Sequence, residues 1–181
     1  MKEICTPIKE YTDFNLMYDD CQNIIQSVSE KYTNLNLAGV IKIIRTSYDK
    51  AILNSFYNIG NLPKYVATSV NSKSLVLKIS MDSLLKNVIE HPEISIGEYK
   101  NIAGYLHNAD YIFLKNEKNL IYFKIAGSIY QFVIKNTKDG MENYITTFHK
   151  ASIKQLEKDI KRYKQIKNSS DCEDSNYPSV T

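Results

Sequence analysis

The side chains best suited to chemistry lie in three strand-like segments, "LIYFKI", "SIYQFVIK" and "YITTFHK". Side chains alternate between the two faces of a strand, so polar residues of one parity from each segment can share an open sheet face. The residues that such a face would present are Tyr122, Lys124, Gln131, Lys135, Thr147 and His149. Histidine can accept or donate a proton near neutral pH, and lysine and threonine offer charge and hydrogen bonds to phosphate.

This combination of side chains suits metal-independent cleavage of RNA. In that reaction a base removes the proton of the 2′-hydroxyl, an acid protonates the leaving 5′-oxygen, and cations stabilise the extra negative charge on phosphorus. A tyrosine on the same face can stack on an unpaired base. Each residue also has a purely structural interpretation, because lysines on a solvated sheet face and a histidine at a strand end are common.

Another histidine, His91, lies at the corner "IEHPEIS" between two helical stretches. It either caps the helix that ends before Pro92 or takes part in chemistry, and the sequence leaves both interpretations open. Glu93 either belongs to the turn or acts as a general base, and Glu93 and His91 can orient one another. His107, next to Asn108, is interpreted as a residue at a helix C-terminus.

The sequence lacks the signatures of several common enzyme classes. It contains no P-loop, GxGxxG, HExxH or GxSxG motif. Cys5, Cys21 and Cys172 are widely spaced and form no CxxC pair, so we interpret them as reduced thiols. We therefore expect neither a metal nor a cofactor.

Nothing in the sequence predicts contact with a membrane. No stretch approaches the roughly 18 uninterrupted apolar residues that a membrane span needs, and "MKEICTPIKEYTDF" lacks the apolar run of a secretory signal. We expect a cytoplasmic location.

Positive charge is concentrated in the middle of the chain. Residues 1–63 hold 6 Lys and Arg against 7 Asp and Glu, residues 64–167 hold 17 against 10, and residues 168–181 hold 0 against 3. The middle segment therefore has a net charge of +7 and also contains most of the strand signals, which is typical of a protein that binds a polyanion. A lysine-rich solvated surface is the alternative explanation.

Hydrophobic periodicity predicts a pair of helices in the first 63 residues. The first covers residues 13–32 with Thr12 or Asp13 as its N-cap, and the second covers residues 36–60. Nothing in this region suggests catalysis. We expect residues 1–63 to form a helical N-terminal region, residues 64–167 an α+β domain, and residues 168–181 a polar disordered tail.

Residues 64–167 carry mixed signals of helices and strands. We predict strands at 65–70 and 74–79, a helix at 81–91 capped by Ser80, and a helix at 96–106 opened by the capping box of Ser95 and Glu98. Four further strand-like segments follow at 110–115, 119–126, 128–136 and 143–150, and the tight-turn residues between them predict an antiparallel meander. A basic helix at 152–166 closes the pattern, with Ile153, Leu156, Ile160 and either Tyr163 or Ile166 facing inward.

Residues 76–154 resemble a phage-associated nuclease family within the fold group of barnase, EndoU, colicin D and RelE, a family found at the C-terminus of proteins similar to the Mu head-morphogenesis protein. The matching segments are "LVLKISMDSLLKNVIEHPEIS", "EYKNIAGYLHNADYIFLK" and "LIYFKIAGSIYQFVIKNTKDGMENYITTFHKAS", in that order. The resemblance implies a curved antiparallel sheet with flanking helices and ribonuclease activity used as a toxin between phages, mobile elements and bacterial hosts.

Carried over by position, the resemblance makes His91, Lys124, Thr147 and His149 the catalytic candidates and Lys86 and Lys135 the phosphate contacts. Tyr122 and Gln131 complete the expected substrate surface. We therefore predict a metal-independent endoribonuclease that leaves 2′,3′-cyclic phosphate ends, with tRNA as one substrate and an immunity or antitoxin protein as partner. The alternative is a non-catalytic phage or mobile-element protein whose basic sheet face binds a protein or nucleic acid.

Overall fold

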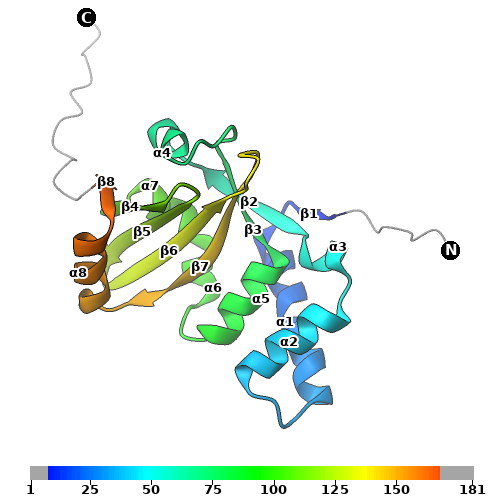
Figure 1. Cartoon of the computed structure of the whole chain (residues 1–181). Coiled ribbons are helices and arrows are strands. Elements are labelled where there is room, and N and C mark those ends of the chain that lie inside the picture. The colour runs from blue at the N-terminus through cyan, green and yellow to red at the C-terminus, as the bar shows by residue number, and fades with distance from the viewer. Residues whose placement is uncertain (1–7, 168–181) are drawn as a thin grey trace, which may run out of the picture.

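The computed structural model describes residues 8–167, and their largest feature is one mixed sheet of eight strands (Figure 1). The strands are β1 Glu10–Tyr11, β2 Phe56–Asn61, β3 Val76–Ser80, β4 Tyr111–Asn116, β5 Asn119–Ala126, β6 Ser128–Asn136, β7 Asn143–Ala151 and β8 Lys164–Lys167. Their order across the sheet is β1-β2-β3-β7-β6-β5-β4-β8, which leaves the sheet open. The α+β class is thus confirmed, whereas a barnase-like fold is not.

The helices of the described region are mostly short. They are α1 Phe14–Lys31, α2 Leu37–Ser47, α3 Lys50–Leu53, α4 Lys64–Ser69, α5 Met81–Glu90, α6 Ile96–Lys100, α7 Ile102–His107 and α8 Ile153–Arg162. None of the helices within residues 8–167 is long and apolar enough to cross a membrane.

The predicted meander is confirmed as β4 to β7, with antiparallel pairing throughout. Its β6–β7 turn needs Gly140, which has a φ of 78°. A Cβ at this position would lie 2.8 Å from the backbone oxygen of Asn71, so the turn and the neighbouring loop fit together only around glycine. The expectation of an entirely antiparallel sheet is wrong, because β1 pairs with β2 and β3 with β7 in parallel.

Two assignments on either side of Pro63 are wrong. Residues 56–61, expected as the end of a helix, form β2, and residues 64–69, expected as a strand, form α4. Pro63 precedes α4, a position where proline's fixed φ and missing N–H are tolerated. β2 pairs with β3 across this proline, from Phe56↔Ser80 to Asn61↔Val76, so long-range pairing overrides the helical spacing of apolar residues.

The first two helices do not form an isolated pair. α1, which Asp13 caps as expected, packs against α2, and both pack against α5. Arg45 of α2 also binds the carboxylate of Asp82 on α5 through two hydrogen bonds of 2.7 and 2.9 Å. One hydrophobic core therefore includes side chains from both sides of residue 63.

The caps predicted around the His91 corner are confirmed. Ser80 accepts a hydrogen bond from the Ser83 N–H, and Ser95 and Glu98 form the complete capping box of α6. The helix expected at 96–106 is divided at Asn101 into α6 and α7. α5 ends at Glu90, so His91 is its C-cap residue.

The basic C-terminal helix is shorter than expected and continues into a strand. α8 ends at Arg162, and β8 then pairs with β4 at the edge of the sheet. Leu156 is buried as expected, but Ile153 and Ile160 are exposed, so their predicted inward orientation is wrong. The expected tail, residues 168–181, lies outside the described residues.

The two faces of the meander are covered differently. The side carrying Tyr122, Phe132 and Phe148 faces the main core, and we call it the core face. The opposite side packs Phe113 and Phe123 against α8, and we call it the α8 face. In Figure 1, α8 lies at one side of the meander and α5 at the other.

Candidate active site

Two of the histidines singled out in the sequence stack on each other. The rings of His91, at the end of α5, and His149, on β7, have centroids 4.9 Å apart and an interplanar angle of 21°. We call these two residues the histidine pair. The Glu93 carboxylate lies 3.5 Å from Nδ1 of His91, so the turn that follows α5 also orients this ring.

His149 is the more enclosed member of the histidine pair. Its Nδ1 is buried and has no hydrogen-bond partner among the described residues. Burial lowers the pKa of His149 below its ordinary value, and the charges of His91 and Lys86 act in the same direction while Glu93 opposes them. His149 is therefore neutral at neutral pH, the form that can accept a proton.

Buried Asn87 on α5 positions the strand that carries His149. Its Oδ1 accepts a hydrogen bond of 2.9 Å from the Phe148 N–H, and its Nδ2 donates to the backbone oxygens of Ser83 and Thr146. The bonds to Phe148 and Thr146 give backbone groups of β7 a partner beyond the point where β3 stops pairing with this strand. Sequence reasoning missed Asn87, although a polar residue among Leu84, Leu85 and Val88 of α5 was an available signal.

Three further candidates lie near the histidine pair or on the same face. Lys86 lies on α5, five residues before His91, and its partly exposed ammonium group lies 3.9 Å from the carboxylate of Glu90. Thr147 and His149 point to the α8 face, since they pair with Val133 and Gln131 of β6. Lys135 has the same parity as Gln131 and is exposed farther along β6.

Gln131 lies on this face but is covered by α8. It is 6% exposed, and its amide donates a hydrogen bond of 3.1 Å to buried Asp159. Gln155 donates to the other carboxylate oxygen of Asp159 at 2.9 Å. Gln131 therefore anchors α8 beside the histidine pair, which differs from the substrate contact that the sequence predicted.

Tyr122 and Lys124 do not join the other candidates, so the single face of six residues is a wrong expectation. The register pairs Ile121 with Val133 and Phe123 with Gln131, which places Tyr122 and Lys124 on the core face. Tyr122 is fully buried and offers no ring surface for a base. Lys124 Nζ lies 3.2 Å from the carboxylate of Asp110.

The groups that remain at this site are proton donors and acceptors. Within residues 8–167 no group of three or more His, Cys, Asp or Glu side chains could hold a metal ion. The histidine pair, Lys86 and Thr147 supply two imidazoles, one cation and one hydroxyl on α5, its C-cap and β7. No family model, curated protein or solved structure matches the chain.

Proposed function

We propose that the chain is a metal-independent endoribonuclease whose acid and base are the histidine pair. The observation that carries this proposal is the stacking of His91 on His149, since two imidazoles from separate elements can exchange roles as base and acid. The toxin role in phage or mobile-element conflict, tRNA as substrate and an antitoxin partner follow only from the resemblance described above.

In the proposed reaction, neutral His149 takes the proton of a ribose 2′-hydroxyl. The 2′-oxygen forms a bond to phosphorus, the bond from phosphorus to the 5′-oxygen breaks, and His91 acts as the general acid that gives a proton to that oxygen. The products are a 2′,3′-cyclic phosphate and a free 5′-hydroxyl. Lys86 and Thr147 stabilise the charged phosphorane through charge and a hydrogen bond.

The alternative function is binding without cleavage. It is favoured by the placement of Lys124 on the core face, because fewer cations then converge on the histidine pair than the sequence predicted. In this alternative the same side of the sheet binds a nucleic acid or an acidic protein of a phage or mobile element.

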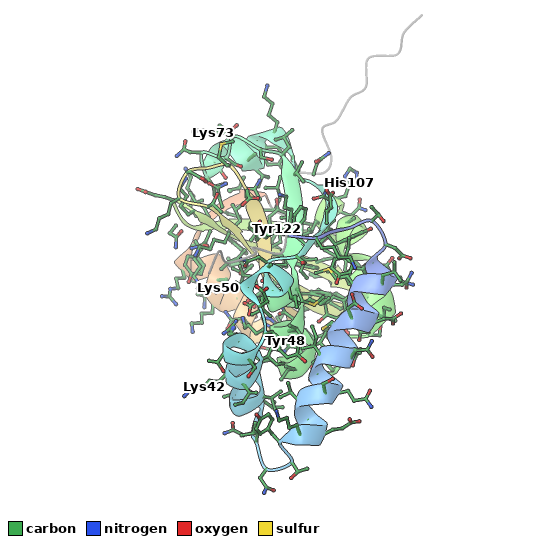
Figure 2. The ribbon with its side chains drawn as sticks, turned by 90° about the vertical axis from the view of Figure 1, so that its right-hand side faces the viewer. Lys42, Tyr48, Lys50, Lys73, His107 and Tyr122 are labelled. Atoms are coloured by element: carbon green, nitrogen blue, oxygen red, sulfur yellow. The ribbon has the colours of Figure 1, made fainter. Side chains whose placement is uncertain are left out.

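The deciding experiment is incubation of the purified chain with total RNA in the presence of EDTA. We expect fragments with 2′,3′-cyclic phosphate ends, and a loss of about 10²–10⁴-fold in rate for His91→Ala and His149→Ala. His107→Ala is the matched control, since this histidine is exposed on α7 (Figure 2) and is not part of the histidine pair. If the RNA stays intact with a folded wild-type chain across pH 5–9, the proposed endoribonuclease activity is wrong and the binding function remains.

A further inference from the structure

A hollow of about 460 Å³ lies between the first turn of α5 and the β6–β7 hairpin. The lining side chains that matter for the argument are Phe56, Ser80, Ser83, Lys135, Tyr144 and Thr146. They include two aromatic rings, hydroxyl groups and one ammonium group.

The hollow opens on the same face as His149. Tyr144 pairs with Lys135 and His149 pairs with Gln131, so Tyr144 and His149 both point to the α8 face despite the bulge between them. The two residues are five steps apart on β7, and at roughly 3.3 Å per step their separation is at most about 17 Å. A chain of a few nucleotides spans that distance.

The charges around the hollow favour an anion. Glu142 is neutralised by Lys78, whose Nζ lies 2.9 Å from its carboxylate. Lys135 is exposed and forms no ion pair with a carboxylate of residues 8–167. One cation therefore remains available for a phosphate.

The aromatic side chains favour a flat ring as the other part of the ligand. Phe56 and Tyr144 are half-buried, and Lys78 Nζ lies 4.2 Å from the centroid of the Phe56 ring and 6.0 Å from that of Tyr144. The partly buried Lys78–Glu142 ion pair lies beside both rings, and the rings retain partial exposure. Aromatic side chains fixed beside a cation are the usual platform for an unpaired base.

We propose that this hollow binds a nucleotide of the RNA substrate a few residues away from the cleaved bond, with the base on Tyr144 and a phosphate on Lys135. This inference rests on the proposed endoribonuclease function and adds a second contact to its substrate. Because of this second contact, we expect RNA long enough to reach from the histidine pair to the hollow to bind more tightly than shorter RNA.

The test measures binding of a fluorescent 2′-O-methyl hexanucleotide by fluorescence anisotropy at several salt concentrations. This oligonucleotide cannot be cleaved because it lacks the 2′-hydroxyl. We expect Tyr144→Ala to raise Kd by about 5- to 150-fold through lost stacking, and Tyr144→Phe to retain most of the affinity. Lys135→Ala should weaken binding and reduce the slope of log K against log salt by about 0.7, the value for one phosphate contact to a single strand.

The matched controls are Tyr48→Ala and Lys50→Ala. Tyr48 lines a different hollow, and both residues lie on the side of the molecule formed by the N-terminal helices (Figure 2). Neither substitution should change Kd. Circular dichroism of each variant checks that the fold is retained.

The outcomes separate the hollow from the catalytic proposal. If the wild-type chain cleaves RNA and Tyr144→Ala and Lys135→Ala bind the hexanucleotide with unchanged affinity, the proposal for the hollow is wrong and the endoribonuclease proposal stands. Binding that depends on Tyr144 and Lys135 without any cleavage supports the hollow and overturns the enzyme. A wild-type chain that neither binds nor cleaves RNA overturns both.

Discussion

His149 holds an imidazole in a place that favours its neutral form. Its Nδ1 is buried without a partner, and His91 and Lys86 add positive charge nearby. Such an arrangement lowers stability in acid and also provides a base at neutral pH, which is why perturbed histidines are common at active sites. The same property therefore gives a test that does not depend on knowing the substrate.

We predict that the free energy of unfolding falls as pH decreases below about 6.5, the ordinary pKa of His149. The folded pKa lies below this value, so the unfolded chain binds more protons in this range and acid favours unfolding. The slope that one such histidine contributes is at most about 1.4 kcal/mol per pH unit, and it ends below the folded pKa. Urea denaturation from pH 7.5 to 5 measures it.

The control for this prediction is His149→Asn, which removes the titrating group and should flatten the profile in this range. If the free energy of unfolding of the wild-type chain and of the variant changed equally with pH, the pKa of His149 would be the same in the folded and unfolded chain, which contradicts the prediction.

The sequence predicts which residues of one strand share a face, but not which residues of different strands do. The pattern correctly places Thr147 with His149 on one face and Tyr122 with Lys124 on one face. Whether those two faces are the same depends on register, which the turns between strands determine. The sequence therefore predicted the histidine pair's members and failed on Tyr122 and Lys124.

At the scale of elements, α5 connects the core to the histidine pair. Asn87 lies in the middle of this helix and holds the backbone of β7 immediately before His149. Because Asn87 is fully buried, its hydrogen bonds fix the position of β7 without competition from water. The same helix carries Lys86 and ends at His91.

We predict that Asn87→Ala lowers the free energy of unfolding by about 1–3 kcal/mol, because the buried Phe148 N–H loses its partner. RNA cleavage should fall further than stability explains, since the stacking of the histidine pair depends on the position of β7. Urea denaturation and cleavage rates under conditions where the variant is folded measure the two effects. Gln22→Ala, at an exposed position of α1, should stay within about 0.5 kcal/mol of wild type.

Secondary structure could be predicted where local and long-range preferences agree. The meander and the caps at Ser80 and Ser95 agree in this way, because turn and cap residues coincide with the changes in hydrophobic period. Residues 56–61 show the opposite case, in which helical spacing conflicts with pairing to β3. That pairing joins two strands separated in the sequence by Pro63 and α4, so it cannot be predicted from the residues near either strand.

At the scale of the whole molecule, the segments on either side of residue 63 share one sheet and one core. β2 lies next to β3, and Phe14 and Tyr18 of α1 pack against the buried ring of Tyr99, with centroids 6.1 and 5.8 Å away. Tyr99 in turn contacts Phe148, the residue before His149, in an edge-on arrangement at 5.3 Å. The N-terminal segment therefore supports the candidate active site through the core.

We predict that residues 64–167 expressed alone do not fold cooperatively, because removing residues 1–63 uncovers the core side of α5 and the edge of β3. Thermal unfolding followed by circular dichroism should show no sharp transition, and bound hydrophobic dye should increase relative to the full chain. Adding residues 1–63 as a separate polypeptide should restore part of the structure if the two segments assemble through β2 and β3. A cooperative transition for residues 64–167 alone, with the mid-point of the full chain, would instead make the N-terminal helices an addition to an independent domain.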